Sequence, residues 1–498
     1  MTDEETPLLG DAAPPSNLSK TQVAYARFSR SQKRTISALV SYSGLLPRAF
    51  HFACSLSLSV LRVCLNVRIV FAGGSFIPSI PEIAHDLGST PKVISLAVSI
   101  SIFSAAVGSM TFATYSSFYG RRPMYMVGLP LLCIGSLGVG TSTRIPELLF
   151  WRFVQAFGAS GGMSVGGGII ADIYSLTERG TAMGIFHAAS LLGNALAPIV
   201  GGWVAHYTSW RYLQFGLCLS GALLWLLMLL YLPETSHPGI TGWEKLIEAE
   251  HAEGKEDDGR FRWAWLNPLE CLWYLRSPVI LLTTYSTAAT LITEYGLQVP
   301  MAHTIGTRYG ITNPALIGAC FIPMGAGNIL GAPLAGWMSD RIVIKYREKR
   351  GGVWVPEDRL RGSRIGAATL VPLSVLGSGL VTQYGPDGML GLALNLCCFF
   401  VNGVGVDTVL APNSAYSVDI MREKSAQVMA AGAALRSSFL AIAVALVLPS
   451  MEKNGVLITD ALGAAIAFTA FLSITICIRY GDKLRAAVDI GFTTIDEL

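Results

Sequence analysis

Long apolar runs recur along this chain, and they alternate with short polar segments. A helix needs about 20 apolar residues to cross the roughly 30 Å hydrocarbon core of a bilayer. Twelve runs meet this length, at 53–80, 93–115, 124–142, 146–170, 181–205, 211–232, 277–301, 312–338, 364–383, 388–410, 425–449 and 456–478. Strand-type alternation is absent, and backbone in lipid must satisfy its own hydrogen bonds. The pattern predicts an all-α integral membrane protein with twelve transmembrane helices.

Three polar stretches, at 1–52, 233–276 and 339–363, are longer than the rest. The middle one divides the twelve predicted spans into six and six. Two equal halves are typical of a transporter built from repeats, with one six-helix bundle in each half. The first polar stretch is rich in Pro, Ser and charge, which favours disorder. The predicted parts are an N-tail (1–52), an N-terminal bundle (53–232), a linker (233–276), a C-terminal bundle (277–480) and a C-tail (481–498).

Composition and charge agree with this pattern and orient it. Only 14% of the residues are Asp, Glu, Lys or Arg, against about 25% in soluble domains. With both termini in the cytosol, 27 Lys and Arg fall on the cytosolic side and 5 on the other, as the positive-inside rule requires. The sequence therefore predicts a multi-pass protein with cytosolic termini, in the cell membrane or alternatively the vacuolar membrane.

Other classes of function leave no trace in the residues. The nine cysteines show no CxxC or Cys/His spacing, so neither a disulfide framework nor a metal site is indicated. No phosphate-binding GxxxxGK[ST] motif is present, and there is no nucleic-acid motif or catalytic constellation. We expect a monomer embedded in lipid that is not an enzyme and uses no cofactor.

A basic loop follows the second predicted span. It reads "SSFYGRRPMYMVG" and contains Gly120, Arg121 and Arg122. Six spans later, "GWMSDRIVIKYREKRG" contains Gly336, Asp340 and Arg341. Similar loops at matching places in two halves indicate an internal repeat.

At these loops the sequence resembles the major facilitator superfamily, and within it the fungal twelve-spanner drug:proton antiporters. The family loop runs approximately G-x-x-x-D-R-x-G-R-R, and here Ala113, Ser117 and Phe118 replace its first Gly, Asp and Arg. "WRY" at 210–212, "LPET" at 232–235, "PEDRL" at 356–360 and "AYSVD" at 415–419 also resemble this group. The resemblance implies that the loop latches the halves by charge contacts, and that the first-half latch is weaker without its Asp.

Two further patterns lie in spans four and five. "RFVQAFGASGG" is similar to the family's R-x-x-Q-G through Arg152 and Gln155, which implies that Arg152 lines the cavity and responds to a proton nearby. Snorkelling to the outer surface is the alternative. "GNALAPIVGG" is similar to the antiporter pattern G-x-x-x-G-P-x-x-G-G, and Pro and Gly at such positions suit a hinge, a packed gate or plain helix packing. The matching residues are Gly193, Pro198, Gly201 and Gly202.

Deep charges in the other spans are candidates for proton coupling. A carboxyl group in a low-dielectric site can bind and release a proton near neutral pH, so Glu294 is the first candidate and His187 a weaker one. Asp407 and Arg436 reach similar depth, so an ion pair between them is plausible, with a structural or a transport role.

Several polar side chains are candidates for contact with a small-molecule substrate or for bridges between helices. They are Tyr295, Gln298, Asn328, Asn402, Asn413 and Gln155. Arg62 and Arg68 interrupt the first span, where the resembling family is apolar. Either Arg68 faces the cavity and binds an anion, or the span is shifted or the gene model is in error.

These observations favour a secondary transporter that exports small organic molecules, such as drugs, toxins or secondary metabolites, in exchange for protons. Its two bundles would rock around a midplane site, driven by the proton gradient. An uptake carrier or facilitator for an organic acid or another nutrient is the alternative. A non-transporting receptor is a remote third hypothesis, because no sizeable extramembrane domain is predicted.

Overall fold

The structure is a computed structural model, and regular secondary structure in the residues it describes is helical throughout. The described residues are 76–173, 197–236, 241–252, 264–353, 355–421 and 425–488, with part of 32–40. Eight described helices are long and apolar enough to cross a membrane. The predicted all-α membrane fold is confirmed.

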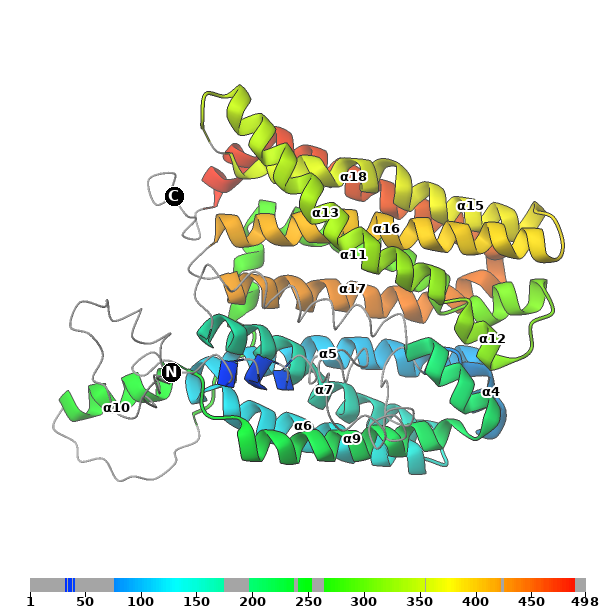
Figure 1. Cartoon of the computed structure of the whole chain (residues 1–498), viewed down its shortest axis with the longest axis horizontal. Helices are drawn as coiled ribbons and strands as arrows, with labels where there is room; N and C mark the ends of the chain where they lie inside the picture. The colour runs from blue at the N-terminus through cyan, green and yellow to red at the C-terminus, as the bar shows by residue number, and fades with distance from the viewer. Residues whose placement is uncertain are drawn as a thin grey trace, which may run out of the picture.

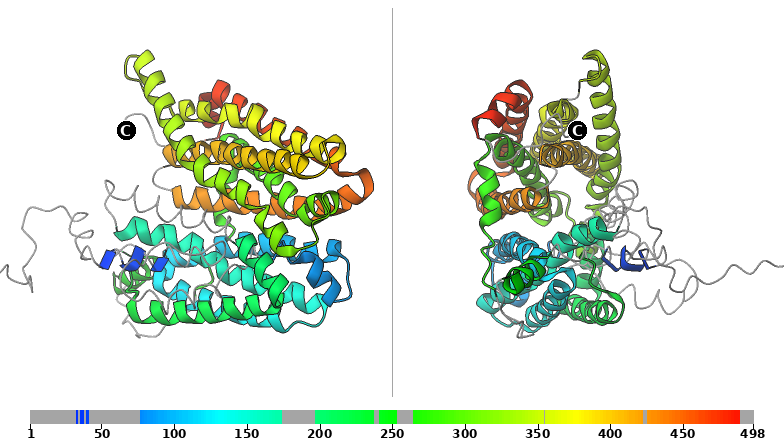
Figure 2. Two further views of the ribbon diagram at one scale, coloured as in Figure 1. Left: turned by 45° about the vertical axis from the view of Figure 1, so that its right-hand side comes forward. Right: turned by 90° about the vertical axis from the view of Figure 1, so that its left-hand side faces the viewer.

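The helices form two bundles that lie one above the other (Figures 1 and 2). The first holds α4 (Ile80–Asp86), α5 (Pro91–Tyr119), α6 (Arg121–Thr141), α7 (Ile145–Ile173), an unlabelled helix at 197–207 and α9 (Trp210–Tyr231). The second holds α11 (Pro278–Gln298), η2 (Ala302–Gly306), α12 (Pro314–Ala319), α13 (Ile322–Lys349), η3 (Pro356–Gly362), α14 (Ser363–Ile365), η4 (Gly366–Leu370), α15 (Val371–Tyr384), α16 (Met389–Ile420), α17 (Ser425–Asn454) and α18 (Val456–Ala487). The linker contributes α10 (Gly242–Ala252) and η1 (Glu270–Arg276).

Ten of the twelve predicted spans coincide with described helices. The first lies outside the described residues up to position 75, and the fifth is described only from 197. The eighth predicted span, 312–338, lies within one candidate membrane span at Pro314–Lys349, and the structure refines it in two respects. The segment is divided between α12 and α13, where Pro323 occupies the first turn of α13 and cannot donate a backbone hydrogen bond. Helix α13 then continues through charged residues to Lys349.

The two bundles touch along α5 and α17, which run side by side in both views (Figures 1 and 2). We call the end of the molecule that carries α10 the linker end, and the other the opposite end. At the opposite end Lys92 Nζ lies 3.3 Å from Glu452 Oε2. Toward the linker end Met110 packs with Ala431 and Ala434. This seam therefore joins the bundles over most of their length.

The apolar core shared between the bundles is larger at the opposite end than toward the linker end. At the opposite end a single cluster joins Ile94 and Val98 on α5 to Met324 and Val444 of the second bundle. Toward the linker end, the largest described clusters each stay within one bundle. Among the described residues, the bundles are thus fused more extensively at the opposite end.

Large apolar side chains cover the outside of the helices. Leu219, Leu330, Leu373 and Ile442 are each about 60% exposed. Such a surface is unfavourable in water and suits contact with lipid tails.

Glycines allow α13 and α16 to approach closely. A Cβ atom at Gly327 would lie 2.3 Å from the Phe400 carbonyl oxygen, and one at Gly331 would lie 2.9 Å from the Val404 Cα. Small residues at helix contacts allow this backbone approach in membranes. These two glycines therefore serve the packing of α13 against α16.

Gly327→Ala should destabilise the second bundle, because the added methyl group meets backbone atoms that cannot rotate away. Overpacking of this kind costs about 1–3 kcal/mol. Gly336→Ala on the same helix is the matched control, since a Cβ there meets no atom within 4 Å. Thermal unfolding of the full-length protein in detergent measures both variants. Equal melting temperatures would contradict the packing described.

Candidate functional site

A fully buried arginine lies in the first bundle. Arg152 on α7 is 1% exposed. Its Nη1 donates to Gln155 Oε1 over 2.8 Å, and its Nη2 donates to Ser101 Oγ over 2.9 Å. The guanidinium also lies 4.2 Å from the ring centroid of Phe76. A charge at this depth needs such partners, so the side chain faces protein and does not snorkel to the surface.

Gln155 extends this contact to two more helices. Its Nε2 donates to Ser136 Oγ on α6 and to Gln214 Oε1 on α9, both over 2.8 Å. Gly135 makes room, because a Cβ there would lie 2.4 Å from the Gln155 nitrogen. We call Ser101, Ser136, Arg152, Gln155 and Gln214 the arginine network. It joins α5, α6, α7 and α9, and the expected response of Arg152 to a proton stays a prediction.

A buried carboxylate lies in the second bundle. Glu294 on α11 is 5% exposed. Its Oε1 accepts hydrogen bonds from Gln298 Nε2 and from Asn328 Nδ2 on α13, both over 3.0 Å. Gln298 also lies 3.1 Å from the Met324 sulfur. Gln298 and Asn328, which were predicted to contact a substrate, thus donate hydrogen bonds to Glu294, which was predicted to carry the proton.

Asp407 on α16 lies beside this group. It is 7% exposed, and its charge is close enough to interact with that of Glu294. Its Oδ2 accepts no hydrogen bond within the described residues. A Cβ at Gly331, one turn after Asn328, would lie 3.2 Å from the Asp407 Cβ. We call Glu294, Gln298, Asn328 and Asp407 the carboxylate cluster.

The expected ion pair between Asp407 and Arg436 was wrong. The ion pairs of the described residues do not include it, and Asp407 faces the α11–α13 side instead. Arg436 lies half-buried on α17. Counting from helix ends gives the depth of a residue and leaves its direction around the helix open, which is why equal depth did not bring the two together.

The remaining candidate substrate contacts mostly bridge helices. Asn402 Nδ2 donates to Ser374 Oγ over 3.1 Å, and Asn413 Nδ2 donates to Ser286 Oγ over 3.1 Å. Tyr295 packs against the apolar cluster that the bundles share. Of the two readings considered for these side chains, bridging is therefore the observed one for Asn402 and Asn413.

The span-five glycines lie at a contact between the bundles. A Cβ at Gly202 would lie 2.2 Å from the Pro314 carbonyl oxygen, and one at Gly318 would lie 2.5 Å from the Pro198 carbonyl oxygen. Gly201 is buried beside them. The 197–207 helix thus meets α12 backbone to backbone, which fits a packed gate and plain helix packing alike. Gly193 and His187 lie outside the described residues.

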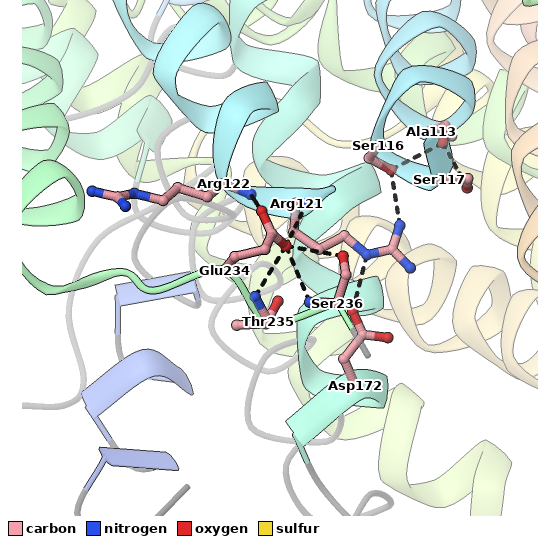
Figure 3. A network of polar contacts seen from close by, with 9 residues as sticks. All are labelled: Ala113, Ser116, Ser117, Arg121, Arg122, Asp172, Glu234, Thr235 and Ser236. Atoms are coloured by element: carbon pink, nitrogen blue, oxygen red, sulfur yellow. Dashed lines mark hydrogen bonds and ion pairs between the residues drawn. The ribbon is translucent and has the colours of Figure 1, made fainter. Parts of the chain in front are cut away.

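The basic loop between α5 and α6 is closed by a carboxylate from the start of the linker. Glu234 Oε1 accepts from the Arg121 backbone nitrogen over 2.9 Å, and Oε2 accepts from that of Arg122 over 3.1 Å (Figure 3). Ser236 also donates to Oε1. A carboxylate at a helix N-terminus satisfies unpaired N–H groups and the helix dipole. Gly120 has φ +99°, and a Cβ there would meet Glu234.

Arg121 links three helix ends, whereas Arg122 points away from them (Figure 3). Arg121 Nε lies 3.0 Å from Asp172 Oδ2 at the end of α7, and its Nη1 donates to Ser116 Oγ over 2.9 Å. Asp172, at the end of one span, thus pairs with an arginine of the loop between two others. Ser117, which replaces the family Asp in sequence, bonds within its own helix to Ala113.

The second bundle repeats this contact with a different arginine. Arg359 Nε lies 2.7 Å from Asp419 Oδ2, and its Nη1 lies 3.1 Å from Asp340 Oδ1. Arg341, which matches the family loop in sequence, stacks instead on Trp337 with its Cζ 4.3 Å from the ring centroid. Arg359 makes two ion pairs where Arg121 makes one and a bond to serine. These contacts each lie within one bundle, so a latch between the halves stays a prediction.

This chain matches known proteins both in sequence and in fold. The family model described as Major Facilitator Superfamily matches residues 64–447. The chain belongs to the Major Facilitator Superfamily. It is a transporter and not an enzyme, and the resemblance noted in the sequence is confirmed at this level.

Relatives within the superfamily include fungal exporters. "Efflux pump radE" of Floropilus chiversii is 26% identical over 86% of this chain and 80% of its own length. "MFS antiporter QDR3" of Candida albicans is 33% identical over 33% of this chain and 24% of its own length. Two solved structures share the superfamily fold. The xylose transporter XylE from E. coli has a TM-score of 0.62 at 14% identity, covering 90% of this chain and 98% of that one. A bacterial homologue of the lysosomal transporter Spinster has a TM-score of 0.59 at 13% identity, covering 92% and 98%.

Several residues that belong to the superfamily patterns make contacts that the patterns alone did not predict. Glu234 of "LPET" caps α6, and Arg359 of "PEDRL" bridges Asp340 and Asp419. Glu357 of "PEDRL" accepts a hydrogen bond from Tyr416 of "AYSVD" over 3.1 Å. These motifs are short and lie far apart in sequence. The opposite charges of Arg359, Asp340 and Asp419 were the available signal that some of them meet.

Arg359→Ala should destabilise the protein more than Arg341→Ala, although both remove a basic residue from the same region. The first leaves Asp419, which is 22% exposed, without its ion pair. Loss of a partly buried charge partner costs about 1–3 kcal/mol, and loss of an exposed cation–π contact about 0.5–1 kcal/mol. Thermal unfolding in detergent compares the two, and a larger loss in Arg341→Ala would contradict the ion pairs described for Arg359.

Proposed function

We propose that this transporter is a proton-coupled antiporter that exports small organic molecules by alternating access. Both termini would lie in the cytosol, so the linker end faces the cytosol and the opposite end faces the outside of a cell or the lumen of a vacuole. The excess of Lys and Arg on the linker side supports this orientation. The fungal relatives named as an efflux pump and as an antiporter support export and antiport.

The observation that carries the proposal is the carboxylate cluster. Two amide N–H groups point at Glu294 and stabilise one negative charge there. The neighbouring carboxyl of Asp407 opposes a second charge, because like charges repel strongly where water is excluded. The cluster is therefore suited to carry one negative charge and to exchange one proton with whichever side has water access.

Packing between the bundles supports alternating access. At the opposite end they share an apolar core and a backbone contact between the 197–207 helix and α12. Opening that end requires both to separate, whereas the linker end is held by the charged contacts of each bundle's own loop. A proton on the carboxylate cluster would alter the charge buried between α11, α13 and α16, and so bias which end opens.

Glu294→Gln should abolish coupling, because glutamine keeps the side-chain size and cannot bind or release the proton. The full-length protein is reconstituted in liposomes that contain a pH-sensitive dye, and a panel of amphipathic organic compounds is added. In the unmodified protein, a transported compound should move protons in the opposite direction. In Glu294→Gln this proton movement should fall to the level of empty vesicles.

Glu452→Gln is the matched control, because Glu452 is an exposed carboxylate at the opposite end. It should leave proton movement unchanged. Compound movement that ignores an imposed pH gradient would overturn the coupling, and compound movement in the same direction as the proton would favour an uptake carrier.

A further inference from the structure

One side-chain contact reinforces the gate between the 197–207 helix and α12. His206 Nε2 lies 3.4 Å from Asn313 Nδ2. His206 belongs to the first bundle and Asn313 to the second, and both lie next to the close approach of Gly202 to Pro314. Any change in this contact therefore acts between the bundles.

The orientation of the Asn313 amide is fixed by a second hydrogen bond. Asn313 is the N-cap of α12, and its Oδ1 accepts from the Ala315 backbone nitrogen over 2.8 Å. The oxygen is committed to the cap, so the NH₂ group is the part that faces His206. An NH₂ group only donates. His206 Nε2 must then be the acceptor, which requires a neutral imidazole with its proton on Nδ1.

His206 lines the same cavity as a carboxylate. His206 is exposed and lines a cavity of about 410 Å³ at the opposite end. Within the described residues, the other titratable side chains that line it are Glu82 and His85 on α4, while the α12 side supplies Thr312, Pro314 and Ile317. Burial raises the pKa of Glu82, so a cation nearby would stabilise its carboxylate form.

We propose that His206 is a proton-binding site of the gate, and that a proton taken up from the side opposite the linker loosens the contact between the bundles. A protonated imidazole donates from both ring nitrogens and accepts at neither. Protonated Nε2 is a donor facing a donor, so the bond to Asn313 is lost. The cation is drawn instead toward Glu82, which belongs to its own bundle. A contact between bundles is thereby exchanged for one within a bundle.

This proposal rests on the alternating-access part of the proposed function and is independent of the carboxylate cluster. Its test therefore measures the gate and not transport. Hydrogen exchange of the full-length protein in lipid nanodiscs is followed for the amides of α12 at about pH 7.5 and about pH 5.5. After correction for intrinsic exchange, α12 should exchange about threefold to tenfold faster at the lower pH, the range for one lost hydrogen bond.

Asn313→Asp provides the sharpest variant, because it should invert the response. Aspartate caps a helix as well as asparagine does, but it presents an acceptor to His206 in place of a donor. Protonated His206 would then bond across the gate, and α12 should be better protected at the lower pH. His206→Gln keeps an acceptor and does not titrate, so its α12 should be equally protected at both.

His85→Gln is the matched control, since His85 lines the same cavity without the bond to Asn313. It should keep the response of the unmodified protein. The proposal is overturned if α12 exchanges equally at both pH values in the unmodified protein. It is also overturned if Asn313→Asp keeps the original direction, or if the response disappears in His85→Gln and persists in His206→Gln. None of these results depends on whether Glu294 couples protons to transport.

Discussion

Charged side chains removed from water need protein partners, and this requirement organises both bundles. Arg152 meets two neutral oxygens and an aromatic face, and Glu294 meets two amide N–H groups. The partners come from neighbouring helices, so each buried charge also fixes how those helices pack. Asp407 is the exception, because its buried Oδ2 accepts no hydrogen bond from the described residues. Burial of a carboxyl group whose hydrogen bonds are incomplete costs stability.

The two bundles solve the same problem at the linker end with different residues. In each, one arginine joins the ends of neighbouring helices, through Asp172 in the first bundle and through Asp419 in the second. The third contact is a serine in the first bundle and Asp340 in the second. The first bundle adds a carboxylate from the linker, Glu234, which holds the loop backbone. The repeat is thus preserved in geometry more closely than in sequence.

Hydropathy predicted most of the fold, because bilayer thickness sets the length of an apolar run and that length can be counted directly in the sequence. Depth along a helix was legible for the same reason, and it placed Arg152, Glu294 and Asp407 among the buried charges. The side of the helix from which a side chain projects could not be read from the sequence. Asp407 was therefore predicted to pair with Arg436 and not to face the side of Glu294. The ion pairs of Arg359 with Asp340 and Asp419 were not predicted, because Arg359 returns to the loop motif only after α13 has ended. The contact of His206 with Asn313 depends on which amide atom a helix cap uses, and that information lies in the fold.

The position of Glu234 ties the first bundle to the chain that follows it. The cap of α6 is supplied from beyond the end of α9, by a residue that belongs to the connection between the halves. A first half divided from the second just after Tyr231 would lose this carboxylate, while one divided after Ser236 would retain it. The first bundle is therefore complete only when it includes the start of the connecting segment, and not when it stops at the last apolar residue.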